Sequence, residues 1–125
     1  MRVNIEHGQK STGLFSRTTW HTIRTSVQFT PEEMDVIKRT KMKNLVVLER
    51  VNWRKAKGLT QVEFDQLKSA YYLRVKDLIS GDVHEVETPV EAREYEEILK
   101  EALHALKSHI EASATAPAGR QTFDL

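Results

Sequence analysis

The last third of the chain carries an apolar stripe at helical spacing, and this stripe constrains the fold more than any other feature. Thr88, Pro89 and Glu91 supply an N-cap hydroxyl, a first-turn proline and a capping-box carboxylate. The stripe behind them consists of Tyr95, Ile98, Leu99, Ala102, Leu103, Leu106 and Ile110. A helix from Pro89 to Ala112 is about 36 Å long at 1.5 Å per residue. It therefore needs an apolar surface of similar length.

Two segments near the N-terminus alternate as strands with one covered face do. They are Arg2 to His7 and Thr19 to Phe29, and the polar stretch from Gln9 to Gly13 between them predicts a hairpin. The core face of the second strand is predicted to carry His21, Ile23, Thr25, Val27 and Phe29. The opposite face then carries Trp20, Thr22, Arg24, Ser26 and Gln28. At 3.3 Å per residue this strand is also about 36 Å long.

Two more capping boxes predict short helices in the middle of the chain. Thr30-Pro31-Glu32-Glu33 precedes Met34 and Ile37, and Thr60-Gln61-Val62-Glu63 precedes Phe64 and Leu67. The run Leu45-Val46-Val47-Leu48 within Asn44 to Asn52 predicts a central strand that is buried on both faces. Tyr71 to Val75 predicts another strand, Ser80-Gly81-Asp82 a turn, and Val83 to Glu87 a short edge strand.

Together these patterns predict an α+β fold. An antiparallel or mixed β-sheet is covered on one face by the long C-terminal helix and one or two short helices, and we expect no cleft between helix and sheet. Residues 1–112 form a single domain, because 125 residues suffice for one core but not two. Residues 113–125 are rich in alanine, glycine and proline and are predicted to be a disordered tail.

The sequence lacks the residues and motifs that several classes of chemistry require. The chain has no cysteine, which excludes thiolate catalysis and a disulfide framework and fits a cytoplasmic location. No apolar stretch approaches the ~18 residues of a membrane span, and no nucleophile elbow or glycine-rich phosphate loop occurs. The five histidines never fall four residues apart, and the glutamates of the last helix avoid its stripe. We expect no metal and no cofactor.

Charge is strongly segregated. Residues 1–76 carry fifteen basic and seven acidic side chains (+8), whereas residues 77–125 carry four and eleven (−7). A basic segment contains Lys38, Arg39, Lys41, Lys43, Arg50, Trp53, Arg54, Lys55 and Lys57. Such a segment can bind a phosphate backbone, or it can meet the acidic half of another copy of the chain. The alternatives are solvated cations beside a hydrophobic strand and cations that pair with the acidic helix.

The leading functional hypothesis is a non-enzymatic interaction domain that binds a protein partner or itself. The candidate surfaces are the basic segment and an uncovered sheet face with Trp20, Arg24 and Tyr72. The first alternative is a nucleic-acid-binding accessory protein that uses Lys38 to Lys57. The second alternative is a small enzyme that uses His7, His21 or His84 near a carboxylate such as Glu85, in a pocket that perturbs the histidine pKa.

The chain ends in Gln121-Thr122-Phe123-Asp124-Leu125. Gln121, Phe123 and Leu125 are candidates for docking by the tail, because exposed hydrophobic residues on a flexible segment form short binding motifs. The pentapeptide resembles the glutamine-led, hydrophobic-ended peptides that bind bacterial sliding clamps, although Phe123 and Asp124 depart from the usual order. The alternative is a tail end without a function.

Overall fold

The computed structural model describes residues 1–12, 18–50 and 72–115. Its largest sheet contains the N-terminal hairpin. β1 (Arg2–Thr12) pairs antiparallel with β2 (Thr18–Gln28), from Arg2 opposite Gln28 to Thr12 opposite Thr18. β5 (Asp82–Val86) pairs antiparallel with the other edge of β2, so the strand order is β1-β2-β5. The hairpin and the late edge strand were both predicted.

The first arm of the hairpin is longer than the sequence predicts. The turn expected at Gln9 to Gly13 is wrong over its first four residues, because Gln9 to Thr12 continue the ladder opposite β2. Gln9, Lys10 and Ser11 are exposed in this strand. Exposed polar residues can continue a strand that backbone pairing holds in place, so the polar composition of Gln9 to Thr12 did not mark the end of the strand.

The short helix behind Thr30 forms as predicted. In α1 (Pro31–Arg39), Thr30 Oγ1 accepts the Glu33 N–H at 3.1 Å and Glu33 Oε1 accepts the Thr30 N–H at 2.9 Å. The chain's amino terminus adds an ion pair of 2.8 Å to the same carboxylate. Burial opposes ionisation, but these hydrogen bonds and the amino-terminal charge lower the pKa of Glu33. Val36 and Ile37 anchor the helix in the core.

The predicted central strand is wrong in its placement. β3 (Val46–Glu49) follows a 3₁₀ turn at Met42–Asn44 and pairs only with β4 (Tyr72–Arg74) in the described part of the chain, as a separate two-stranded sheet. Val46 is 42% exposed. An unbroken apolar run predicts burial on both faces, but in β3 Val46 and Glu49 are exposed and Val47 and Leu48 are only half-buried.

A helix that the sequence did not predict links the two sheets. α4 (Val75–Ser80) takes over where the predicted strand Tyr71 to Val75 ends early, at Arg74. The Asp77 carboxylate accepts the Arg74 N–H at 2.8 Å and so caps the helix. Val75 and Leu78 are fully buried. Gly81, with φ of +93°, then turns the chain into β5, as the predicted turn requires.

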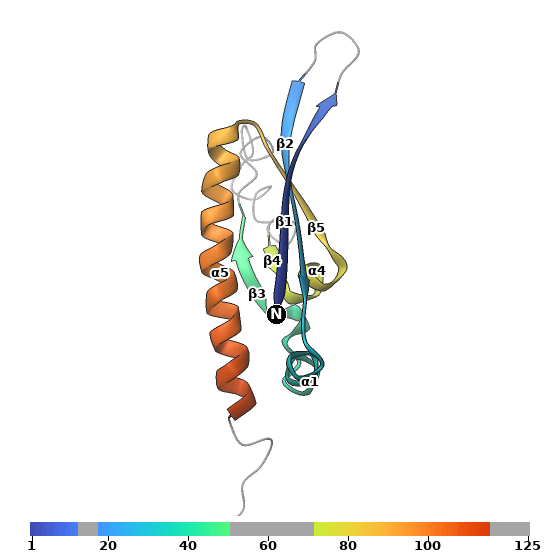
Figure 1. The fold of residues 1–125 in the computed structure, drawn as a ribbon, viewed down its shortest axis with the longest axis vertical. Helices are drawn as coiled ribbons and strands as arrows, with labels where there is room; N and C mark the ends of the chain where they lie inside the picture. Colours follow the sequence, from blue (N-terminus) through green and yellow to red (C-terminus); the bar gives the residue numbers. More distant parts are fainter. Residues whose placement is uncertain (13–17, 51–71, 116–125) are drawn as a thin grey trace, which may run out of the picture.

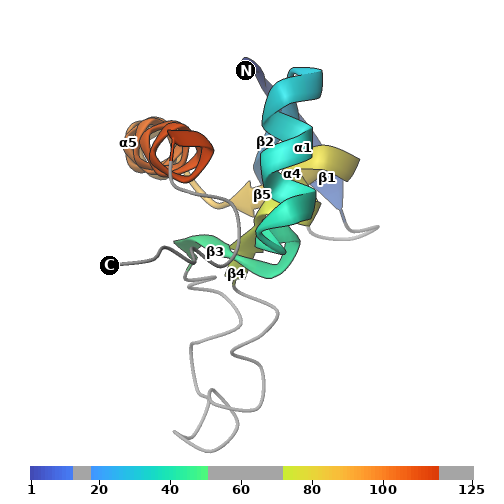
Figure 2. The same cartoon turned by 90° about the horizontal axis from the view of Figure 1, so that it is seen from below.

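α5 (Pro89–Thr115) is the long helix that the sequence predicts. Thr88 Oγ1 accepts the Glu91 N–H at 3.2 Å, and the Glu91 carboxylate accepts the Glu87 N–H at 3.2 Å. The helix runs three residues past Ala112, so the predicted tail is wrong for residues 113–115, and residues 116–125 lie outside the described part of the chain. Figures 1 and 2 show α5 alongside the sheet, roughly parallel to β1 and β2.

One apolar core joins the layers. Its buried members are Ile23, Val27, Val36, Ile37, Met42, Leu73, Val75, Leu78, Val86, Ala92, Tyr95, Leu99, Leu103, Leu106 and Ile110. The predicted α+β fold is therefore confirmed: antiparallel sheets, a long C-terminal helix and shorter helices. The second short helix, predicted behind Thr60, lies outside the described residues.

Candidate functional site

β1 is an open edge of the main sheet. Among the described residues its only strand partner is β2, and the ladder between them runs over eleven pairs without a bulge or a proline. Apart from Ile5, residues 2–11 are all exposed. An edge strand presents unpaired N–H and C=O groups, and native proteins protect it with charged side chains, a proline, a bulge or a covering element. β1 carries the charged residues Arg2, Glu6 and Lys10 but no proline and no bulge. β1 can therefore accept another strand.

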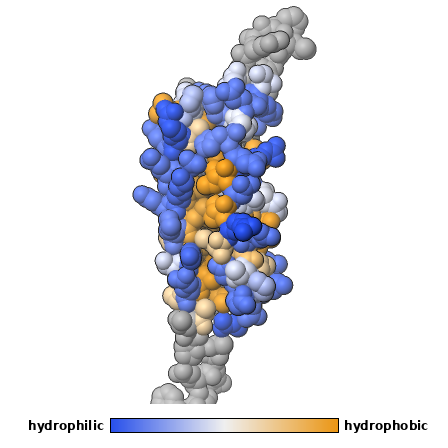
Figure 3. Space-filling model, viewed as in Figure 1, coloured by the Kyte–Doolittle hydropathy of each residue, from blue (hydrophilic) through white to orange (hydrophobic). Residues whose placement is uncertain are grey.

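An apolar groove runs beside this edge, between β1 and the middle of α5. It has a volume of about 380 Å³ and is lined by Met1, Val3, Ile5, Lys100, Leu103, His104 and Lys107. Figure 3 shows the corresponding band of hydrophobic side chains along the body, bordered by hydrophilic residues. Val3 is 38% exposed although its side chain is on the face that α5 covers. The long helix thus leaves part of the apolar face of the sheet uncovered.

A second hollow contradicts the expectation of no cleft under the helix. It lies between β3, β5 and the first turns of α5, and its volume is about 240 Å³. The ionisable groups that line it are Glu49, Arg50, His84, Glu91, Glu94 and Tyr95. Arg50 Nη1 donates to Asp82 Oδ2 at 2.6 Å, and both side chains are only 12% exposed. Burial opposes ionisation of Arg50, but the Asp82 carboxylate more than offsets this and raises its pKa.

His84 and Tyr95 form the aromatic wall of this hollow. Their ring centroids are 4.3 Å apart at an interplanar angle of 32°. Burial, reinforced by the positive charge of Arg50, lowers the pKa of His84 to about 4. Burial also raises the pKa of Tyr95, against the effect of the Arg50 cation. At neutral pH both rings are therefore uncharged.

These groups suit binding better than proton transfer. A general acid or base works best with a pKa near the operating pH, and that of His84, about 4, is far below it. Arg50 is neutralised by Asp82, so it is not a free cation for an anionic substrate. The sequence did assign Arg50 to the basic segment and His84 to a perturbed pocket, but nothing in it signalled that Arg50 and Asp82, 32 positions apart, would pair.

The other two histidines of the enzyme hypothesis do not share this pocket. His7 is opposite Ile23, and His21 is opposite Gln9, so the two are not direct cross-strand neighbours. His7 Nε2 lies 3.3 Å from Glu96 Oε1 on α5, with its side chain 42% exposed. Glu85, the carboxylate proposed to assist them, pairs with Lys10 at 3.3 Å. The structure does not bring these groups together into one site.

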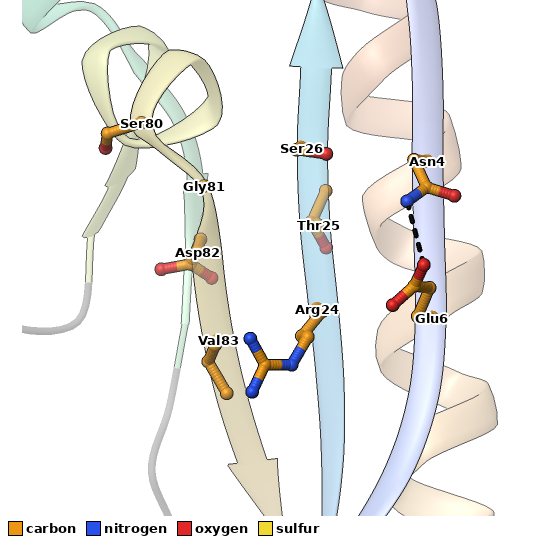
Figure 4. Close-up of a pocket in the computed structure, with 9 residues that line it drawn as sticks. All are labelled: Asn4, Glu6, Arg24, Thr25, Ser26, Ser80, Gly81, Asp82 and Val83. Carbon is orange, nitrogen blue, oxygen red and sulfur yellow. Dashed lines mark hydrogen bonds between the residues drawn. The ribbon is translucent and has the colours of Figure 1, made fainter.

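The outward face of the sheet holds an open polar hollow of about 250 Å³, drawn in Figure 4. Arg24 lies in it, flanked by Glu6 of β1 and Val83 of β5, its neighbours in the ladders. In Figure 4 the Arg24 guanidinium turns toward Val83, away from Glu6. The Glu6 carboxylate instead accepts a hydrogen bond of 3.2 Å from the Asn4 amide.

Trp20, Arg24 and Tyr72 were predicted to share an exposed sheet face, and this prediction is wrong for Trp20 and Tyr72. Trp20 is buried, at 4% exposure, although its strand position is on the outward side. Tyr72 belongs to β4 in the other sheet, where it is half-buried beside Arg74, whose guanidinium carbon lies 5.3 Å from the ring centroid. Alternation gives the side of a strand a residue occupies, but not whether that side is covered or which sheet the strand joins.

The predicted basic segment divides into three parts. Lys38, Arg39, Lys41 and Lys43 are exposed around the end of α1. Arg50 is half-buried and paired with Asp82. Trp53, Arg54, Lys55 and Lys57 lie outside the described residues, as do Gln121, Phe123 and Leu125 of the tail. Nucleic-acid binding by this segment and docking by the tail stay predictions.

Within residues 1–12, 18–50 and 72–115, no three His, Asp or Glu side chains gather closely enough to hold a metal ion. None of the described helices combines the length and apolar character needed to cross a bilayer. Comparison of the chain with protein-family models, curated proteins and solved structures finds no match.

Proposed function

We propose that this chain is a protein-interaction domain that accepts an added strand at the open edge of β1. The observation that carries the proposal is the combination of a regular, uncovered eleven-residue edge with an apolar groove beside it. Strand addition obtains affinity from main-chain hydrogen bonds and specificity from side-chain pockets next to the edge. The groove lined by Val3, Ile5 and Leu103 supplies such a pocket.

The other edge of the sheet supports this choice by contrast. β5 has five residues, between the Gly81 turn and the start of α5, and so offers a much shorter edge than β1. The polar hollow on the outward face contains Arg24 but little apolar surface to bury. Burial of apolar area is the main driving force of association, and the groove beside β1 supplies more of it.

The test compares two valine-to-lysine variants. Val3→Lys places a charge in the groove, whereas Val83→Lys changes an exposed valine on the far edge of the sheet, 47% exposed in β5. Hydrogen exchange of the β1 amides is measured on the full chain at increasing concentration and again with proteins captured from cell extract. We expect β1 protection in the wild type and in Val83→Lys, and its loss in Val3→Lys.

Two results would contradict the proposal. One is a β1 strand whose amides exchange at the same rate under all of these conditions. The other is protection that Val3→Lys and Val83→Lys retain equally, because the groove would then contribute nothing. Circular dichroism of Val3→Lys checks that the variant is folded, which its partial exposure favours.

A further inference from the structure

The order of charges along β1 singles out one partner for its edge, a second copy of the same chain. Arg2, Asn4, Glu6 and Lys10 point to the outward face of the strand, and Val3 and Ile5 point to the groove side. Lys10 is already paired with Glu85 at 3.3 Å. Among the described residues Arg2 and Glu6 form no ion pair. The free charges on this edge are thus one cation and one anion, four residues apart.

Two copies related by a two-fold axis pair the same strand antiparallel with itself. An axis through Asn4 places Arg2 opposite Glu6 twice, and Val3 opposite Ile5 twice. Opposite charges and apolar pairs directly across an antiparallel ladder each stabilise it, whereas like charges destabilise it. This register therefore satisfies both faces of the edge at once.

Neighbouring symmetric registers fit less well. An axis at Glu6 places Glu6 opposite its own copy and Arg2 opposite Lys10, so like charges meet at three positions. An axis at Gly8 places Glu6 opposite Lys10, which already has Glu85 as its partner, and sets Ile5 against Ser11. An axis at Ile5 leaves Arg2 opposite Gly8. In each case either charge or apolar pairing is lost.

We propose that the chain forms a symmetric dimer by antiparallel pairing of β1 with the β1 of a second copy, in the register that sets Arg2 opposite Glu6. The inference rests on the proposed function and deepens it by naming the partner. The two sheets become one six-stranded sheet with the order β5-β2-β1-β1-β2-β5. The grooves beside the two α5 helices then face each other across the joint, where Val3 and Ile5 of both copies become buried.

The first experiment is a charge swap in the full chain, read by sedimentation velocity over a range of concentrations. Arg2→Glu and Glu6→Arg each turn two attractive pairs into repulsive ones, and each should weaken the dimer by about tenfold or more. The double variant Arg2→Glu/Glu6→Arg restores opposite charges and should regain most of the affinity. Arg93→Glu is the control, because it makes the same change of charge at an exposed arginine near the start of α5, outside β1 and the groove beside it.

The second experiment reads the register directly. The chain contains no cysteine, so Asn4→Cys introduces a single thiol at the proposed axis. Residues opposite each other in an antiparallel pair have Cα atoms about 4.5–5.5 Å apart, within the range that a disulfide spans. We expect mild oxidation to link Asn4→Cys into a covalent dimer and to leave Ser26→Cys, on β2, as a monomer.

The outcomes separate the two proposals. A wild-type chain that sediments as a monomer at all concentrations overturns the dimer, and so does a double charge variant that is no tighter than the single ones. If a different captured protein nevertheless protects the β1 amides and Val3→Lys abolishes that protection, the interaction domain stands without the dimer. A dimer that forms while the β1 amides stay unprotected contradicts both.

Discussion

Arg50 and Asp82 form a half-buried ion pair of 2.6 Å that ties the end of the small sheet to the first residue of β5. Each side chain is only 12% exposed, so neither charge is well solvated without the other. The pair also sets the electrostatics of the hollow under α5, because Arg50 lowers the pKa of His84 while Asp82 neutralises the cation. We therefore expect this contact to contribute to the stability of the domain and, second to burial, to the low pKa of His84.

Removal of one partner of this pair should be costly. Asp82→Asn leaves the Arg50 cation buried without a counter-charge, and we expect the free energy of unfolding to fall by about 3 kcal/mol. Urea denaturation measures this change. Glu85→Gln is the control, because it breaks the exposed ion pair with Lys10 and should cost at most about 1 kcal/mol. Equal losses in the two variants would show that the buried pair has no special role.

Stability should decrease in mild acid because of His84. Its pKa is about 4 in the folded chain, below the ordinary 6.5, so the unfolded chain binds the proton more readily between these values. The contribution is complete above about pH 6.5 and is lost as the pH falls toward 4. Between pH 7 and pH 5 we expect the free energy of unfolding to drop by about 2 kcal/mol from this residue.

His84→Gln provides the comparison for that measurement. The variant lacks the titrating ring, so its free energy of unfolding should change less between pH 7 and pH 5 than that of the wild type. An NMR titration of the histidine rings gives an independent reading. A His84 ring that titrates near pH 6.5 would contradict the burial described above.

Replacement of Thr25 by valine should increase the stability of the fold. The side chain is 1% exposed on the core face of β2, and its Oγ1 has no hydrogen-bond partner in the described part of the structure. A buried hydroxyl without a partner carries a desolvation penalty. Thr25→Val keeps the shape and removes that penalty, so we expect a gain of about 1 kcal/mol in thermal or urea unfolding. Ser26→Ala, on the exposed face, should change stability by less than about 0.5 kcal/mol. A loss of stability in Thr25→Val would reveal a hydrogen bond at this hydroxyl.

Any residue other than glycine at position 81 should destabilise the fold, because of the backbone conformation and not because of a steric clash. Its φ of +93° and ψ of 136° lie in a region that residues with a Cβ rarely adopt, while a Cβ built there meets nothing within 4 Å. Gly81→Ala should therefore destabilise the fold by about 1–3 kcal/mol. Gly81→Asn should do the same, because asparagine tolerates the left-handed helical region but not this one. Wild-type stability of the asparagine variant would place the turn elsewhere in φ and ψ.

Sequence reasoning succeeded where a local signal decides the structure. The hydroxyl, proline and carboxylate at Thr30 and Thr88 placed the starts of α1 and α5, since capping involves residues only a few positions apart. Alternation assigned Ile23, Thr25 and Val27 correctly to the buried face of β2. Similarly, Gly81 marked the turn before β5.

The failures share a physical cause. Whether Val46 is buried or exposed depends on what another part of the chain places over it, and the same holds for Trp20 on the outward face. The Arg50–Asp82 pair and the hollow beside His84 arise from segments that only the tertiary fold brings together. α4 was missed because its six residues are too few to show a helical period in the sequence. Its cap is the Asp77 carboxylate, which does not form one of the hydroxyl-led capping boxes that marked the other helices. The open edge of β1 also needed the strand order, which no local pattern encodes.

The place of β5 in the sheet has a consequence for how the chain folds. The two arms of the hairpin are close in sequence, but β5 joins β2 only after residues 82–86 have been synthesised. Bringing such distant segments together costs loop-closure entropy, so this step should follow hairpin formation. Until β5 docks, β2 also has an unpaired edge. A nascent chain then has two edges, one on β1 and one on β2, at which it can pair with another chain. Docking of β5 on β2 therefore also removes one of the two bare edges at which nascent chains can pair with each other.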